Sequence, residues 1–218
     1  MDPLDTKPTR MNPMKVLLPL VIAAALGTVA APAAHADSND NWVVRFGAHA
    51  VDPKSNTGNL AGARSTTSTS VRPTGSIEYM ITPNLGVDLL AAWPFQHNVK
   101  LSGVGKVAQT KELPPTLGIN YHFLPDSQVS PFVGVGVNYT NFFDTKGAGA
   151  LKGASVSIDN SWGVAAHAGV DVKINSKWIF TADLRWVDIE SDVHVNGAKV
   201  GTAKIDPLVY GVSLGYRF

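Results

Sequence analysis

Side chains that could do chemistry recur at every second position in several alternating segments of the chain. They are Arg45, Glu78, Asp88, Asn120, His122, Asp171, Lys173, Asp183 and Arg217. Carboxylates, cations and an imidazole gathered in one interior can form ion pairs, or they can pass a proton or an ion. Buried charges persist only where they are paired or hydrated, and no motif accompanies a conducting path. A structural polar plug is therefore the favoured interpretation, and a proton or ion path is the alternative.

Three histidines share this parity, namely His49, His122 and His167. Imidazoles from different segments could bind a metal, but no ligand-spacing motif accompanies them. Histidines satisfied by hydrogen bonds are the favoured interpretation. The sequence has no G-x-S-x-G, H-E-x-x-H or P-loop pattern, and it has no cysteine. We therefore expect no metal, no cofactor and no enzymatic activity.

The composition limits the elements that could position these residues. With 218 residues the chain forms one domain or at most two. Its 18 lysines and arginines nearly balance 17 aspartates and glutamates, so the chain lacks the positive net charge that attracts nucleic acid. Charged residues make up 16% of the chain, well below the roughly 25% of soluble domains. A chain so poor in charge must bury much of its surface or contact lipid.

Residues 1–36 have the layout of a secretory signal peptide. Residues 16–31 are almost wholly apolar, and Ala34-His35-Ala36 supplies the small residues of a cleavage site. Three basic residues precede or open the apolar stretch, namely Lys7, Arg10 and Lys15. A membrane-spanning helix is the alternative, but the stretch is shorter than the ~20 residues that a span needs. Cleavage after Ala36 would leave a mature domain at 37–218.

The mature chain alternates between apolar and small or polar residues, with the period of a strand that has two different faces. The last segment is the clearest example. One of its faces carries Phe218, Tyr216, Leu214, Val212, Tyr210 and Leu208, and the other carries Arg217, Gly215, Ser213 and Gly211. Eight such strands are predicted, near 42–51, 71–82, 85–96, 112–124, 130–143, 161–174, 178–190 and 204–218.

A soluble β-sandwich would also alternate, but three features favour a membrane barrel. Aromatic residues such as Trp42, Trp93 and Trp186 flank the apolar face at strand ends. Glycines fall on the inner face, where they relieve crowding. Short turns alternate with long connections, which are predicted loops at 52–70, 97–111, 144–160 and 191–203. The fold class is therefore all-β, an eight-stranded antiparallel transmembrane β-barrel of a Gram-negative outer membrane.

The inner face changes character along its length. Above the polar plug, inward parity places an apolar cup formed by Leu90, Pro94, Phe142, Val187 and Ile189. Because lumen walls in contact with water are normally polar, this hydrophobic lumen indicates a pocket for an apolar ligand. The alternative is a parity shift at the strand ends, which a bulge at Pro94 or Pro207 would produce.

Several linked motifs resemble the OmpW family of outer-membrane proteins, and the resemblance covers the whole mature chain. They are Gly86 to His97, Leu113 to Thr116, Tyr121-His122-Phe123, Pro131 to Thr140, Ser161-Trp162-Gly163, Gly169-Val170-Asp171 and Asp183 to Trp186. The resemblance implies an eight-stranded barrel with a narrow hydrophobic channel. It further implies passage of small hydrophobic molecules, and some relatives aid alkane uptake. Loops 52–70 and 144–160 match no signature, so the ligand is not carried over.

Passive uptake of small hydrophobic solutes is the predicted function, with lateral release into the bilayer because the plug blocks a straight path. The alternative is a structural or adhesive barrel that acts through its extracellular loops. The expected partners are outer-membrane lipid and lipopolysaccharide, small hydrophobic solutes, and the barrel assembly machinery, which would read Phe218. No nucleic acid is expected.

Overall fold

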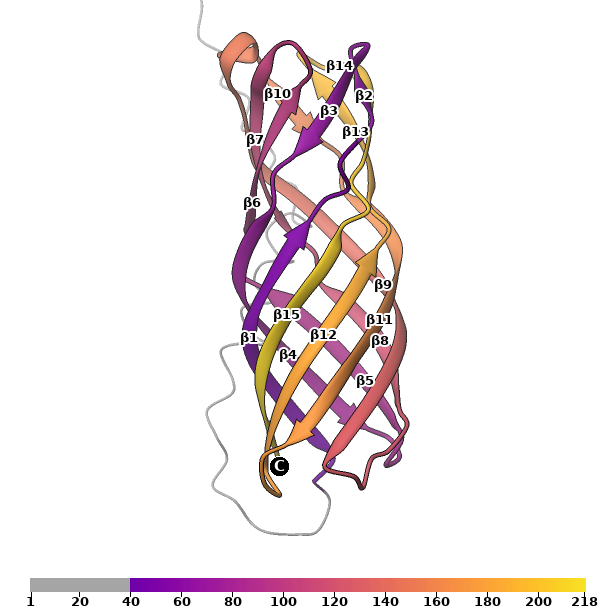
Figure 1. The fold of residues 1–218 in the computed structure, drawn as a ribbon. Coiled ribbons are helices and arrows are strands. Elements are labelled where there is room, and N and C mark those ends of the chain that lie inside the picture. The colour runs from indigo at the N-terminus through magenta and orange to yellow at the C-terminus, as the bar shows by residue number, and fades with distance from the viewer. Residues whose placement is uncertain (1–39) are drawn as a thin grey trace, which may run out of the picture. The chain divides into compact units, whose positions relative to one another are not determined.

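A computed structural model describes residues 40–218, and the predicted signal peptide at 1–36 lies outside them. Eight antiparallel strands close a barrel in which each strand pairs with its two neighbours and β15 returns to β1 (Figure 1). They are β1 (Trp42–Asp52), β4 (Ser70–Met80), β5 (Leu85–Ala92), β8 (Thr116–His122), β9 (Val129–Gly147), β11 (Ser161–Lys173), β12 (Trp178–Val187) and β15 (Leu208–Arg217). The predicted strand number, order and antiparallel sense are confirmed. No helix within 40–218 is long and apolar enough to cross a membrane.

The barrel continues above this closed ring, and here the prediction of long loops was wrong. The added strands are β2 (Asn59–Leu60), β3 (Ala63–Thr67), β6 (Phe95–Leu101), β7 (Gly105–Leu113), β10 (Val156–Ile158), β13 (Glu190–Val195) and β14 (Ala198–Lys204). They continue the same 15-stranded sheet through the end of β9, in the order β10-β13-β14-β2-β3-β6-β7-β9. A short 3₁₀ turn, η1 (Gly149–Leu151), lies between β9 and β10. We call this part the outer barrel.

Two tight turns explain why parts of the predicted loops form strands. Asn196 and Gly197 join β13 to β14 with φ angles of 49° and 82°. Ala61 and Gly62 join β2 to β3 with φ angles of 50° and 80°. A two-residue hairpin needs positive φ at both central residues to match the twist of its strands, and Asn-Gly supplies this at little cost.

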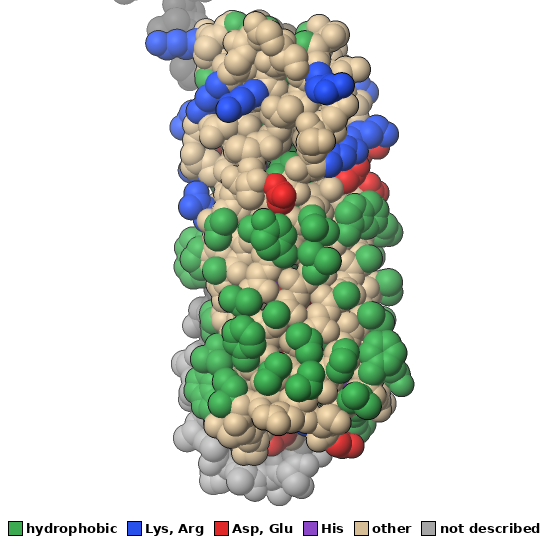
Figure 2. All heavy atoms as spheres, viewed as in Figure 1, with side chains coloured by type: hydrophobic (Ala, Val, Ile, Leu, Met, Phe, Trp, Pro, Cys, Tyr) green, Lys and Arg blue, Asp and Glu red, His purple; other side chains and the backbone are tan. Residues whose placement is uncertain are grey.

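The outer wall of the closed ring is an apolar belt between two sets of aromatic side chains. Trp178 and Trp186 are both exposed, and they delimit nine residues of β12, which matches the 9–11 residues of a transmembrane strand. Figure 2 shows hydrophobic side chains gathered on this part and lysines, arginines and acids above it. The lower aromatic set comprises Trp42, Tyr79, Tyr121, Phe123, Tyr216 and Phe218 as well as Trp178. Such a belt fits a hydrocarbon layer bounded by two interfaces.

Glycines on the inner wall leave room for polar side chains, as predicted. A Cβ built on any of them would come to 3.0 Å or closer to another heavy atom. They are Gly47, Gly86, Gly118, Gly134, Gly136, Gly163, Gly169, Gly211 and Gly215. The small inner residues are therefore required by what fills the lumen.

Replacing Gly134 by alanine will lower the free energy of unfolding by about 1–3 kcal/mol, the usual effect of overpacking. The new Cβ would collide with the Asn120 side chain and lie 2.7 Å from the Ile119 carbonyl oxygen. Gly75 is the matched control, because a Cβ there would have its nearest contact at an ordinary 3.5 Å. Urea unfolding of both variants in lipid vesicles checks this. Equal stability of the two would show that the inner wall is not crowded.

Candidate functional site in the barrel lumen

The lower half of the lumen is filled by a cluster built around Arg45 of β1. Its guanidinium donates to Glu78 Oε2 at 2.7 Å and to Asp171 Oδ2 at 2.9 Å. The other oxygen of Glu78 contacts Asn120 Nδ2 at 3.0 Å and His122 Nε2 at 3.1 Å. Because all five side chains are buried, each charge here is neutralised within the protein. We call this group the Arg45 cluster.

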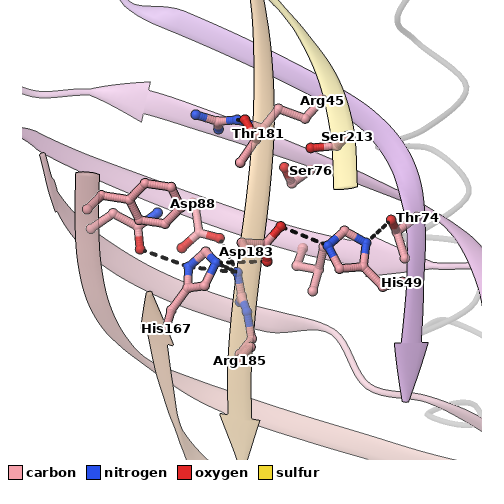
Figure 3. Close-up of a pocket in the computed structure, with 13 residues that line it drawn as sticks. Arg45, His49, Thr74, Ser76, Asp88, His167, Thr181, Asp183, Arg185 and Ser213 are labelled. Atoms are coloured by element: carbon pink, nitrogen blue, oxygen red, sulfur yellow. Dashed lines mark hydrogen bonds and ion pairs between the residues drawn. The ribbon is translucent and has the colours of Figure 1, made fainter. Parts of the chain in front are cut away.

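A second cluster lies on the outer-barrel side of the first and centres on Asp183, and Figure 3 views it with Arg45 toward the top. One oxygen of Asp183 contacts His49 Nε2 at 2.9 Å, and the other contacts His167 Nε2 at 3.0 Å. His167 Nδ1 lies 3.2 Å from Asn120 Oδ1, which joins this Asp183 cluster to the Arg45 cluster. The two together form the polar plug, whose members come from strands all around the ring.

The remaining predicted plug residues also face the lumen. Asp88 accepts from Arg185 at 3.1 Å, and both are buried. Lys173 donates to the Pro125 carbonyl at the periplasmic end, where Arg217 lines the same small void of about 10 Å³. The plug itself leaves a void of about 20 Å³, which is room for about one water molecule. The two voids described here are thus too small to hold a solute larger than a water molecule.

The three lumen histidines, two of them in the Asp183 cluster and His122 in the Arg45 cluster, are all held by hydrogen bonds to acidic or polar side chains. His49 Nδ1 lies 2.5 Å from Thr74 Oγ1, in addition to its contact with Asp183. The ring of Phe132 lies between His122 and His167, with centroid distances of 5.1 and 4.9 Å. Within residues 40–218 no group of three or more His, Asp or Glu residues is arranged to hold a metal ion. These rings pack and bond within the plug.

The predicted apolar cup is split between two levels. Leu90, Val187 and Ile189 surround a void of only about 20 Å³ directly above the plug. They pack there with Val51, Phe95 and Val209, and we call these six residues the apolar layer. Phe142 lies higher and borders a much larger cavity.

Pro94 was wrongly placed in the cup. It lines neither of these cavities, and its carbonyl accepts from Arg72 Nε at 3.1 Å. Strand β5 ends at Ala92 and β6 begins at Phe95, so the inward parity shifts by one residue across the break. Phe95, which is buried, takes the inward position instead. The cause is the missing backbone N–H of proline, which cannot continue the ladder.

A cavity of about 200 Å³ occupies the outer barrel, and we call it the outer cavity. Most of its wall is aliphatic, with Leu60, Val99, Leu101, Val107, Val193 and Ile205 among the lining residues. Strand register places its floor at Glu112, which pairs with Phe95 on one side and Phe142 on the other. Leu101 pairs with Gly105 at the opposite end of the same hairpin. The outer cavity thus stands directly above the apolar layer.

One buried ionisable pair interrupts the aliphatic wall. His97 Nε2 lies 3.2 Å from Glu112 Oε1, and both side chains are at most 2% exposed. Burial lowers the pKa of His97, but its contacts with Glu112 and the Ser68 carbonyl raise it, and the net direction is upward. The floor of the outer cavity therefore holds a buried acid–base pair in which both ring nitrogens of His97 face oxygen atoms, the Ser68 carbonyl at 2.6 Å and Glu112 Oε1 at 3.2 Å.

Residues 39–218 of the sequence match the OmpW family model. The chain belongs to the OmpW family. Outer membrane protein W of Salmonella typhi is 37% identical over 207 residues, which cover 91% of this chain and 98% of that protein. The crystal structure of OprG from Pseudomonas aeruginosa superposes with a TM-score of 0.73 at 32% identity, covering 82% of this chain and 95% of that one. The expected outer-membrane location in a Gram-negative bacterium follows.

A relative that matches a shorter part of the chain carries a name that refers to a metabolic operon. The dibenzothiophene metabolism operon protein PahQ of Pseudomonas aeruginosa is 30% identical over 127 residues, which cover 55% of this chain and 59% of that protein. In this chain the OmpW barrel is layered, with the outer cavity above the apolar layer and the polar plug below.

Sequence reasoning missed most of the outer cavity, because its wall lies in segments predicted to be loops. A usable signal was present at 193–197, where Val193 and Val195 alternate with polar residues before Asn196-Gly197. Alternation followed by Asn-Gly predicts a hairpin. The pairing of His97 with Glu112 had no comparable signal, because the two residues belong to different predicted elements.

Proposed function

We propose that this OmpW-family barrel takes up small hydrophobic molecules passively, holding them in the outer cavity and releasing them sideways toward the bilayer. The observation that carries the proposal is an aliphatic cavity of about 200 Å³ set in the outer barrel. A cavity of about 150 Å³ with such a lining is large enough to hold benzene. Each methylene that leaves water for this wall contributes about 0.8 kcal/mol before ordering costs.

Lateral rather than straight passage is supported by what lies beneath the cavity. The apolar layer and the polar plug leave only small voids, so a solute moving straight down would have to displace paired charges. Within residues 40–218 the outer sheet has no ladder pairing between β9 and β10, although these strands lie side by side. At the lower end of this seam, Asn160 Oδ1 accepts from the Phe142 amide at 3.1 Å. We propose the seam as the exit.

The name of PahQ, which refers to dibenzothiophene metabolism, agrees with a hydrophobic cargo. We propose three partners for the barrel. They are small hydrophobic solutes, lipopolysaccharide around the outer barrel, and the barrel assembly machinery at the last strand. Directly after that strand, Phe218 pairs with Trp42 through two backbone hydrogen bonds of 3.0 Å.

Filling the outer cavity should stop uptake. Ala203 is buried in the cavity wall on β14, whereas Ala198 on the same strand is exposed. We expect Ala203→Phe to reduce uptake of naphthalene by about tenfold, equivalent to 1.4 kcal/mol, and Ala198→Phe to leave it unchanged. The assay compares cells that carry equal amounts of folded barrel. Equal uptake by both variants would refute the cavity as the path and would favour a structural or adhesive barrel.

A further inference from the structure

The His97–Glu112 pair has hydrogen-bonding capacity that the protein leaves unused. The contact between Nε2 and Oε1 is 3.2 Å long, yet neither atom has a hydrogen-bond partner of acceptable geometry among the described residues. The other ring nitrogen of His97 lies 2.6 Å from the Ser68 carbonyl, which fixes the ring orientation. Both residues line the outer cavity, and one polar atom of each is buried in its wall without a full partner.

Other polar side chains that line the cavity are satisfied within the protein. Thr57 Oγ1 contacts Ser65 Oγ at 2.9 Å and Thr67 Oγ1 at 3.3 Å. Thr110 Oγ1 contacts Thr145 Oγ1 at 2.8 Å. Among the described lining residues, the unused hydrogen-bonding capacity is thus concentrated on His97 Nε2 and Glu112 Oε1, which lie side by side.

A purely aliphatic cargo gives no reason for such a pair. Burying an acid–base pair carries a desolvation penalty, and apolar residues of similar volume often stabilise a protein as well or better. A polar group on the cargo would give the pair a function, because it would restore the missing hydrogen bonds. A site built to bond a hydroxyl also rejects analogues that lack it.

The surroundings of the pair select the kind of polar group. A cargo group with a net charge would lose its hydration in a buried, mostly aliphatic cavity, which is strongly unfavourable. A neutral hydroxyl avoids this loss, and it can donate to the Glu112 carboxyl oxygen and accept from an N–H of the His97 ring, whose two nitrogens both face oxygen atoms.

We propose that His97 and Glu112 form a subsite for the hydroxyl group of an otherwise apolar solute, such as an alcohol or a phenol. The hydroxyl donates to Glu112 Oε1 and accepts from His97 Nε2, while its hydrocarbon part contacts the aliphatic wall above. This inference rests on the proposed uptake function and adds a preferred substrate class to it.

The test measures binding of naphthol and naphthalene to the purified barrel in phosphatidylcholine nanodiscs, corrected for partitioning into empty discs. The double variant His97→Leu/Glu112→Leu replaces the pair with apolar groups, a change that is often neutral or stabilising for buried ion pairs. We expect the ratio of naphthol to naphthalene affinity to fall at least about tenfold in this variant, equivalent to 1.4 kcal/mol. Naphthalene affinity should be unchanged or higher.

Glu112→Gln provides a second variant if the double variant does not fold. It keeps the shape and one carbonyl acceptor but removes the charge, so the affinity ratio should lie between those of the parent and of a barrel without the pair. Naphthylmethylammonium and naphthoate test the two charged alternatives, and tighter binding of either than of naphthol would overturn the hydroxyl assignment. An unchanged ratio in the variants, with naphthalene still bound, would refute the subsite alone. If the parent binds neither naphthol nor naphthalene, the proposed function itself fails.

Discussion

Replacing Arg45 by methionine will lower the free energy of unfolding by about 3–5 kcal/mol, the range seen when one partner of a buried ion pair is removed. Methionine fills much of the space but leaves Glu78 and Asp171 without their cation. Glu78 has no exposed surface, so water cannot replace the guanidinium. Asn120 and His122 would still contact Glu78, yet neither supplies the permanent charge of arginine.

Urea unfolding in lipid vesicles, followed by tryptophan fluorescence, measures this loss. Lys54→Met is the matched control, because it removes an ion pair with Asp206 at the partly exposed outer barrel. Such a pair contributes at most about 1 kcal/mol. A loss as small for Arg45→Met as for the control would mean that the plug is hydrated, and the argument against straight passage would then fail.

The closed ring could be predicted from the sequence because lipid and lumen impose opposite demands on alternate residues. In β15 the exposed Tyr210, Val212 and Leu214 alternate with Gly211 and the buried Ser213, and this contrast is visible in the sequence. The members of the predicted polar plug lie on the lumen side, which is the side that the same parity gives them. The alternation of residue types was enough to predict these strands and the direction of their side chains, because each face meets one uniform environment.

The outer barrel could not be predicted in the same way. Its outward face carries lysines, arginines and acids in place of the apolar belt of the closed ring (Figure 2), so the signal of a lipid-facing strand is missing. Its many Gly, Ser, Thr, Asn and Lys residues resemble a loop composition. A break of two residues at Trp93-Pro94 also reversed the parity of the next strand, β6, and brought His97 inward. A shift of one residue exchanges the two faces of a strand. An error in parity at the break therefore assigns every later residue of that strand to the wrong face.

The layered lumen predicts different losses of stability for two residues that the sequence placed in one apolar cup. Val187 is 3% exposed and packs in the apolar layer against Ile189 and Val209, so an aspartate there would have no partner. We expect Val187→Asp to lower the free energy of unfolding by about 3 kcal/mol. Leu90 borders the polar plug as well as the apolar layer, and it lines the void that contains His49 and Arg185. Polar groups in this void can partly satisfy a carboxylate at position 90, although Asp88 and Asp183 line it too, so Leu90→Asp should lose about 1–2 kcal/mol, less than Val187→Asp.

Uptake by the stable variant then separates the two routes through the barrel. Leu90 lies below the outer cavity, in the lining of the void beneath its floor at Glu112. If solutes leave sideways from the outer cavity, Leu90→Asp will take up naphthalene at the parental rate when folded barrel levels are matched. If solutes continue downward, each one must displace water from the new carboxylate at this constriction. Uptake will then fall about tenfold, equivalent to 1.4 kcal/mol. A fall confined to Leu90→Asp, with Ala198→Phe unaffected, would therefore replace lateral release with a route through the plug.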